Sequence, residues 1–447
     1  MIAIKTIAAR AVFTWAIALF CINSPATSLP IEKWTLPSGA QVFLVQSPGL
    51  PMVDVQVDFD AGGRRDSPAQ AGLASVTAAM LSRGVAAVKG APALDENQLG
   101  EAWADLGASF SADAGTDRLS ARLRSLSYPD LLPQAVALAA RQLGQPAFPA
   151  DIWQRERERL GAQIREANTQ PATLAARAFG QAVYGSHPYG FETTQETLAR
   201  IEVADLRRHH SLLLPCRARI SIVGNVNRAQ AETLANRLLG QLPESDTCPA
   251  LPEVSEVMPL DAAAQRSIPF DSAQAHVFVG QPGFKRNDPD FFALSLVGNY
   301  VLGGGGFVSR LTEQVREKRG LSYSVYSYFA PGRHAGAFTV GLQTRPDQAK
   351  QAVDVVQQVL ADFVANGPTE AELKAAKDNL IGGFALRIDS NRKLLDNVAN
   401  IAWNDLPLDY LATWAGRVEK VTAADVKAAF ARKLQPGKMV TVVVGGQ

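Results

Sequence analysis

The chain carries two copies of the same sequence pattern, spaced 221 residues apart. The segment Arg65-Asp66-Ser67-Pro68 recurs as Arg286-Asn287-Asp288-Pro289, and the segment from Pro215 to Gly224 recurs from Pro436 to Gly445. Two matches at one spacing, in distant parts of a sequence, indicate a duplicated domain. The 447 residues also exceed the ~250 to 300 residues at which a single hydrophobic core stops growing. We therefore expect two related domains.

Each copy contains strand-like stretches followed by long helical patterns. Valines alternate with other residues at Val53, Val55 and Val57, and again at Val277 and Val279, as is typical of strands. Strands and helices do not alternate strictly along the chain, which favours the α+β class over a doubly wound sheet. We predict that each domain is an antiparallel-rich sheet packed by long helices.

The N-terminus has the three parts of a secretory signal. Lys5 and Arg10 precede an apolar stretch over residues 11–22, which is shorter than the ~20 residues that span a bilayer. Cys21 suggests a lipoprotein as an alternative, but the bulky Phe20 disfavours lipidation, and we expect cleavage after Ala26. The predicted organisation is a signal peptide at 1–26, domains at 27–241 and 272–447, and a proline-bearing linker at 242–271. The mature protein is predicted to be periplasmic or secreted, without a stable membrane anchor.

Signal removal leaves a nearly neutral protein with two cysteines. Lysines and arginines fall from 44 to 42 against 43 acidic residues, so the net charge becomes −1, and no basic run predicts binding to nucleic acid or anionic lipid. Cys216 and Cys248 remain in what would be an oxidising compartment. They flank one strand–helix unit, which makes a disulfide plausible; two unrelated thiols are the alternative.

The residues themselves reveal no metal site and no common catalytic motif. No two histidines lie four residues apart with a glutamate between them, and the cysteines lack a second pair. We read His209 and His210 as packing residues of a helix and His187 as structural. The chain also lacks the nucleophile-elbow, phosphate-loop and dinucleotide motifs.

The segment Arg316-Glu317-Lys318-Arg319-Gly320-Leu321-Ser322-Tyr323 resembles the arginine and tyrosine segment of the pitrilysin/insulinase (inverzincin) zinc peptidases. The resemblance extends over essentially the whole mature chain and implies half of a clamshell. Family members carry H-x-x-E-H on a helix of the N-terminal half. Here Ser75, Ala78 and Ala79 stand at those three positions, and Gln163 stands near the third ligand. Glu158 or Glu166 could supply one ligand, but one carboxylate does not hold a zinc ion, so we predict no metal in this chain.

Spacing alone favours an ordinary role for Arg316, as a cation near the end of a helix, and for Tyr323, as a strand aromatic. The resemblance reverses this interpretation, because in the family this pair donates hydrogen bonds to the substrate carbonyl. It also implies that Ser111 and Ala112 lie on the strand edge that binds extended peptide. Gly303, Gly304, Gly305 and Gly306 are either a flexible turn or, as we prefer, a place where backbone approaches a ligand.

The resemblance therefore implies a non-zinc-binding subunit of a periplasmic heterodimeric metallopeptidase. A homologous zinc-bearing chain would supply the metal and the general base, and this chain would bind peptide and donate Arg316 and Tyr323 in trans. The alternative is a non-enzymatic peptide-binding or scaffold protein with the same fold. Retention of the arginine and tyrosine favours the first hypothesis. A peptidase with an unusual metal site is a third, weaker hypothesis.

Overall fold

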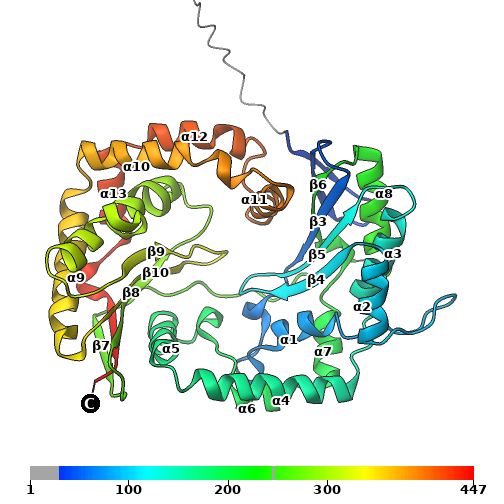
Figure 1. Ribbon diagram of the computed structural model, residues 1–447, viewed down its shortest axis with the longest axis horizontal. Helices are drawn as coiled ribbons and strands as arrows, with labels where there is room; N and C mark the ends of the chain where they lie inside the picture. The colour runs from blue at the N-terminus through cyan, green and yellow to red at the C-terminus, as the bar shows by residue number, and fades with distance from the viewer. Residues whose placement is uncertain (1–29, 244–246, 447) are drawn as a thin grey trace, which may run out of the picture.

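The computed structural model describes residues 30–243 and 247–446, so the predicted signal peptide lies outside the described residues. Two sheets form the framework (Figure 1). The first has the strand order β1-β2-β6-β3-β5-β4 and the second has the order β7-β11-β8-β10-β9. The strands of the first sheet are β1 (Glu32–Thr35), β2 (Gln41–Gln46), β3 (Met52–Phe59), β4 (Ser109–Ala114), β5 (Leu119–Leu126) and β6 (Arg219–Gly224). Those of the second are β7 (Ala264–Ile268), β8 (Ala275–Phe284), β9 (Val325–Phe329), β10 (Gly336–Thr344) and β11 (Val440–Val444).

The two sheets share one topology. In the first, β2 and β6 are parallel and the other pairs are antiparallel; in the second, β7 and β11 are parallel and the rest are antiparallel. The first sheet differs only by the additional strand β1. This correspondence confirms the α+β class predicted from the sequence, with antiparallel-rich sheets.

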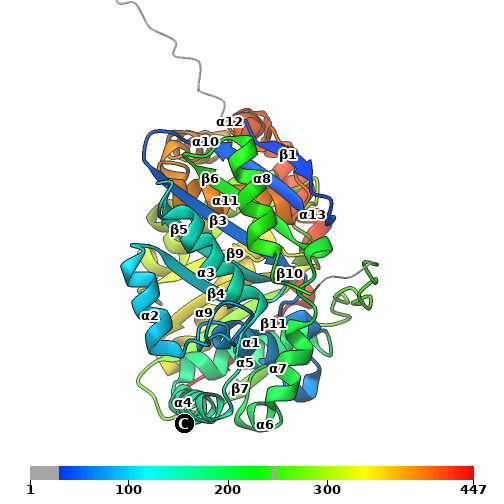
Figure 2. The same ribbon diagram turned by 90° about the vertical axis from the view of Figure 1, so that its right-hand side faces the viewer.

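Helices pack around both sheets. In the first half they are α1 (Leu73–Met80), α2 (Glu96–Asp105), α3 (Leu132–Gly144), α4 (Ala150–Ala167), α5 (Pro171–Tyr184), α6 (Gln195–Ala199), α7 (Val203–His210) and α8 (Arg228–Leu239). In the second half they are α9 (Ala349–Asn366), α10 (Glu370–Gly382), α11 (Asn391–Trp403), α12 (Tyr410–Lys420) and α13 (Ala423–Lys433), with the π-helical segments η5 (Phe292–Gly298), η6 (Tyr300–Gly304) and η8 (Thr312–Glu317). Figure 2 shows α3 and α8 side by side over the first sheet, where their apolar faces join Val53, Val55 and Val57 in one core.

The two halves exchange one helix each. Helix α5 packs on β8 and β11 of the second sheet, where Phe179 contacts Phe278 at 5.6 Å between ring centroids. Helix α11 packs on β3 and β6 of the first sheet, and Arg219 ties its C-terminal end through the carbonyl of Ala402 and the carboxylate of Asp405 (Figure 1). Each domain therefore completes the burial of the other sheet, and the chain forms one interlocked body.

Two expectations about local structure need correction. The predicted linker at 242–271 is too long at its C-terminal end, because residues 264–268 form β7 beside β11. The helix after Pro68 spans only eight residues, Leu73–Met80, instead of the long helix expected there. None of the helices in the described part of the chain combines the length and apolar content needed to cross a bilayer.

Asp66 and His209 form a buried pair beneath the start of α1. Asp66 accepts hydrogen bonds from the N–H groups of Gly72 and Ala74, at 2.9 and 3.0 Å, and its carboxylate lies 3.9 Å from His209 Nε2. Burial raises the pKa of Asp66 to about 7 and lowers the pKa of His209 to about 4. His210, the next residue, instead bonds its Nε2 to the carbonyl of Leu143 at 2.7 Å.

The lowered pKa of His209 predicts loss of stability in acid. The unfolded chain takes up this proton near pH 6.5 and the folded protein only near pH 4, so through His209 acid favours unfolding. The raised pKa of Asp66 acts in the opposite direction, and because both the wild-type protein and a His209→Gln variant contain Asp66, their comparison isolates the histidine. Between about pH 7 and pH 5 the wild-type protein should lose about 2 kcal/mol more free energy of unfolding than a His209→Gln variant. Urea titrations at both pH values measure this difference. Parallel pH profiles for the two proteins would contradict it.

Candidate functional site

A tight turn places Arg316 and Tyr323 on the surface of the second domain. Leu311 and Val315 anchor the preceding helix in the core, while Arg316 projects from its outer side. Gly320 ends the helix with φ of +61°, a conformation that favours glycine, and its N–H donates to the carbonyl of Arg316 at 2.8 Å. The helix therefore ends at this glycine, and the turn holds the arginine and tyrosine side by side.

Arg316 lies between two aromatic rings. Its guanidinium carbon is 4.7 Å from the ring centroid of Phe307 and 4.8 Å from that of Tyr323. Its one ion pair in the described chain is a loose one, in which Nε lies 3.5 Å from a carboxylate oxygen of Glu317. Most of the guanidinium N–H groups therefore remain available to a ligand. The two rings fix the orientation of the guanidinium group. No pattern in the sequence singles out Phe307 for this role.

Tyr323 is 84% exposed, and its hydroxyl has no hydrogen-bond partner among the described residues. Phe307, 72% exposed, lies on the other side of Arg316. Large exposed aromatic side chains on a folded surface commonly mark a binding site. Arg319, by contrast, is bound to the carbonyl and side chain of Gln314 at 2.8 and 2.9 Å and takes no part in this cluster.

The glycine run has a packing explanation at three of its four positions. A Cβ on Gly303 would lie 2.4 Å from Ser327 Oγ, one on Gly304 would lie 2.5 Å from Asn299 Nδ2, and one on Gly305 would lie 2.5 Å from a carbonyl oxygen. Gly306 differs, because it is exposed, has φ of +60° and meets no neighbouring atom. Gly306 is therefore the glycine best placed to let the backbone approach a ligand.

The outer edge of β9 is closed. The Asn299 side chain donates to the carbonyl of Ser327 at 3.1 Å and accepts from its hydroxyl at 2.7 Å, while Gly303 packs against the same residue. Strand β9 ends the second sheet, so η6 covers an edge that would otherwise pair with another strand.

Among the described residues, no strand pairs with the outer edge of β4. In the hairpin with β5, the Gly115 N–H donates to the carbonyl of Arg118. Because inward and outward groups alternate in an antiparallel strand, Phe110, Ala112 and Ala114 direct their backbone groups outward. Ser75 Oγ meets the carbonyl of Ala114 at 3.4 Å, at the end of this edge. The structure therefore places Ser111 and Ala112 on an edge strand, as the resemblance implied, with Ala112 presenting the free backbone groups.

The sheet face that carries Ser111 is polar. Arg124 pairs with Asp54 at 2.7 Å, and Arg118 pairs with Asp58 at 3.0 Å. Asp58 also accepts from Ser120 at 2.6 Å, and burial raises the pKa of its carboxyl. A strand paired with the outer edge of β4 would therefore have two different faces. One would continue the polar face of the sheet, and the other would continue its apolar face.

The positions of the missing metal ligands surround a cavity between α1 and α4. Ser75 and Ala79 from α1 and Gln163 from α4 line a cavity of about 360 Å³, whereas Ala78 is buried in the core behind it. A hydroxyl, a methyl group and an amide do not fit a zinc site, which needs imidazole, thiolate or carboxylate ligands. Among the described residues no three His, Cys, Asp or Glu side chains lie together as ligands. Glu158 and Glu166 are exposed and do not line the cavity.

The one carboxylate in the cavity wall is already paired. Glu156 is buried and lies 2.8 Å from Arg159, 3.3 Å from Arg83 and 3.6 Å from Arg155. Three arginines around one carboxylate hold it as part of the wall between helices. No hydrogen bond, ion pair or ring contact in the described chain joins this cavity to Arg316 or Tyr323, which belong to the other domain.

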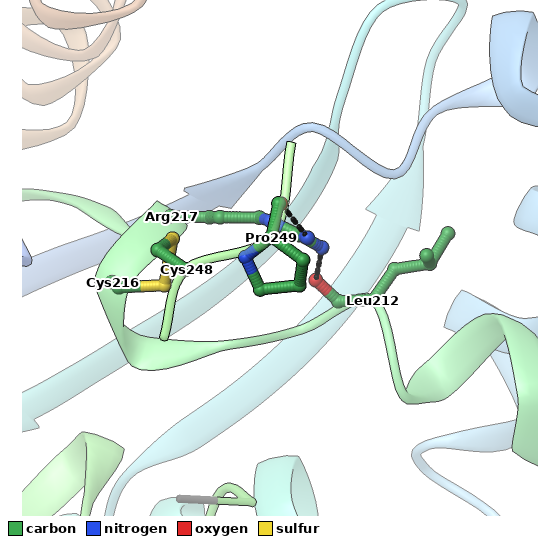
Figure 3. Close-up of a disulfide and its surroundings, with 5 residues drawn as sticks. All are labelled: Leu212, Cys216, Arg217, Cys248 and Pro249. Atoms are coloured by element: carbon green, nitrogen blue, oxygen red, sulfur yellow. Dashed lines mark hydrogen bonds between the residues drawn. A yellow bond between two sulfur atoms is a disulfide. The ribbon is translucent and has the colours of Figure 1, made fainter. Parts of the chain in front are cut away.

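A disulfide lies beside the turn that precedes β6. Cys216 and Cys248 are bonded, with their Cα atoms 6.1 Å apart (Figure 3). The neighbouring Arg217 donates to the carbonyls of Pro249 at 2.5 Å and Leu212 at 3.2 Å. The bond and this arginine attach the start of the segment between the domains to the first domain.

Known proteins match both parts of the chain. Residues 41–196 match the family described as insulinase (peptidase family M16), and residues 200–380 match the peptidase M16 inactive domain. The non-peptidase homolog YmxG of Helicobacter pylori is 27% identical over 388 residues, which cover 84% of this chain and 85% of that protein.

Solved structures share the fold. A peptidase M16 inactive domain from Pseudomonas fluorescens is 35% identical with a TM-score of 0.87, and the match covers 94% of this chain and 98% of that one. The periplasmic protease PqqL from Escherichia coli has the same fold at 18% identity and a TM-score of 0.79; the match covers 99% of this chain and 49% of that protein. As the sequence resemblance predicted, the chain belongs to the M16 family of insulinase-like peptidases.

Proposed function

We propose that this chain is the zinc-less subunit of a periplasmic heterodimeric metallopeptidase. It binds extended peptide and donates Arg316 and Tyr323 to the zinc site of a homologous partner chain. The observation that carries the proposal is the exposed pair itself: the Tyr323 hydroxyl has no partner among the described residues, and two rings hold Arg316 with most of its donors available. Such an arrangement suits a group that acts on another molecule.

The chemistry of the pair fits the hydrolysis of a peptide. A phenol and a guanidinium directed at the carbonyl oxygen stabilise the negative charge that develops there as water attacks. Both groups act by hydrogen bonding and charge, so neither needs a metal in its own chain. The partner would supply zinc and the general base.

The size of the chain supports a two-chain enzyme. A chain of this fold covers 49% of the periplasmic protease PqqL, so two such chains would match one molecule of that size. The predicted signal peptide supports a periplasmic location for this chain. The relative named non-peptidase homolog supports the absence of activity in this chain alone.

The purified chain alone is expected to bind no stoichiometric zinc and to cleave no peptide. Ser75, Ala78, Ala79 and Gln163 replace the ligands and the base, and Glu156 is held by arginines. Elemental analysis after mild dialysis, with a peptide-cleavage assay on the same sample, tests this expectation. One zinc per chain together with cleavage that a chelator stops would contradict it.

A non-enzymatic scaffold protein is the second candidate. It is favoured by the exposed aromatic surface, which would serve an interface equally well. Co-expression with a zinc-bearing homologue separates the two functions: the proposed subunit forms a complex that cleaves peptide, whereas a scaffold forms one whose cleavage does not depend on Tyr323.

A further inference from the structure

A second cavity lies where the two domains meet the segment between them. Its volume of about 420 Å³ is in the range of cavities that bind small ligands, which often lie between domains. The first domain contributes residues beside β2, β3 and β6, and the segment between the domains contributes residues 248–251. The second domain contributes the turn between β9 and β10 and the end of α11. The charged and aromatic residues that line the cavity are Asp60, Arg65, Arg217, Arg219, Arg333 and Trp403.

Positive charge exceeds negative charge around this cavity. Four of its lining residues are arginines and one is an aspartate. The carboxylate of Asp60 is shared by Arg64 and Arg65, at 2.6 and 2.7 Å. Arg219 pairs at 2.6 Å with Asp405, which does not line the cavity. The two carboxylates are therefore already matched by these three arginines.

Arg217 and Arg333 have no ion pair among the described residues. Arg217 donates to the carbonyls of Leu212 and Pro249 (Figure 3), and Arg333 Nη2 donates to the carbonyl of Trp403 at 2.8 Å. Burial lowers the pKa of both guanidinium groups, which is the direction expected for buried cations without a counter-ion. The cavity therefore contains two guanidinium groups that no carboxylate balances.

Two buried N–H groups in the cavity wall also lack an acceptor. Nε of Arg333 and Nε1 of Trp403, a residue that is only 4% exposed, have no hydrogen-bond partner among the described residues. The guanidinium carbon of Arg333 lies 4.8 Å from the ring centroid of Trp403, so each side chain helps to hold the other in place. A buried donor without an acceptor is costly. A ligand that offers oxygen acceptors to these groups would recover that cost.

We propose that this cavity binds a dianionic oxyanion, namely phosphate or a phosphate monoester, in contact with Arg217 and Arg333. A planar guanidinium group matches phosphate oxygens through two parallel hydrogen bonds. A dianion balances two unpaired guanidinium groups, whereas a single carboxylate balances one. Arg217 belongs to the first domain and Arg333 to the second, so the bound anion would stabilise the contact between the domains. The proposal does not rest on the proposed peptidase function.

Calorimetric titration of the isolated mature chain tests the ligand. The probes are inorganic phosphate, glycerol 3-phosphate and, as the monoanion, acetate, all at one ionic strength. We expect one phosphate site per chain and binding of acetate that is weaker by ~10-fold or more, because acetate forms fewer charge-assisted hydrogen bonds. Tighter binding of glycerol 3-phosphate would assign the site to an organic phosphate, and tighter binding of inorganic phosphate would assign it to the free anion. No binding of either phosphate at millimolar concentration, or equal affinity for acetate, would overturn the proposal.

A matched pair of variants at Ala250 tests the location without removing any hydrogen bond. Ala250 is exposed and lines the cavity from the segment between the domains. Ala250→Glu adds a carboxylate that competes for the arginines, and it should weaken phosphate binding by ~10-fold or more. Ala250→Gln has nearly the same size without the charge and should keep the wild-type affinity. Unchanged affinity in Ala250→Glu would overturn the assignment.

Charge removal tests the two arginines directly. Arg217→Gln and Arg333→Gln keep an amide donor but lose the cation, and each should weaken phosphate binding by ~10-fold or more. Arg345→Gln is the control, because Arg345 lies outside the cavity and pairs with Asp347 at 2.6 Å; it should bind phosphate as the wild type does. Phosphate should also raise the melting temperature of the wild-type protein and not that of Ala250→Glu. Wild-type affinity in both Arg217→Gln and Arg333→Gln would place the anion elsewhere and refute the proposal.

Discussion

Tyr323→Phe, in a complex with a zinc-bearing homologue, is expected to lower peptide turnover by ~100-fold or more. The variant removes one hydroxyl that would donate to the developing oxyanion, and one such donor is typically worth ~3 to 4 kcal/mol in the transition state. The ring remains, so its contact with Arg316 should persist. Arg316→Ala is expected to cause a similar loss. Initial rates at saturating peptide measure both effects.

The controls for this prediction come from the same turn. Arg319→Ala should change turnover little, because Arg319 is bound to Gln314 and lies outside the cluster. Assembly and thermal stability of the Tyr323→Phe complex should match the wild type, since the hydroxyl makes no hydrogen bond within the described chain. Normal turnover by Tyr323→Phe and Arg316→Ala in fully assembled complexes would favour the scaffold function.

Removal of the disulfide is expected to lower the free energy of unfolding by ~3 to 4 kcal/mol, because the bond closes a loop with a sequence separation of 32 residues. The variant is Cys216→Ser with Cys248→Ser, and urea titration of the mature protein measures the loss. Gly39, with φ of +87°, packs against Cys216. Replacing Cys216 by the smaller serine should not displace Gly39.

Reduction provides the internal control for the disulfide. A reductant should destabilise the wild-type protein by the same amount and leave the double variant unchanged. Thiol labelling of the denatured, unreduced protein that finds two free cysteines per chain would contradict the prediction.

The architecture could be predicted because duplication and alternation are visible in the sequence itself. The shared spacing identified two domains, and the valines of β3 and β8 identified their central strands. Asn227 caps the start of α8 and Gly320 ends the helix that carries Arg316, through cap and turn chemistry that short segments specify by themselves. The resemblance then placed Ser111 and Ala112 on an edge strand.

The remaining features depend on contacts between distant segments. The exchange of α5 and α11 between sheets has no local signature, because an amphipathic helix does not specify which sheet it covers. Strand β7 pairs with β11 across more than 170 residues of chain, and its exposed residues look like a linker. The cavity beside Trp153, and the packing of Phe307 on Arg316, likewise arise only when separate elements meet.

The most direct test of donation in trans by Tyr323 is reconstitution of peptide cleavage from separate chains. The measurement is the initial rate for this chain alone, for a zinc-bearing homologue alone, and for their mixture, with wild-type protein and with Tyr323→Phe. We expect no cleavage from either chain alone, and a rate for the Tyr323→Phe mixture that is ~100-fold or more below that of the wild-type mixture. Cleavage by this chain alone, or equal rates for the wild-type and Tyr323→Phe mixtures, would contradict the account.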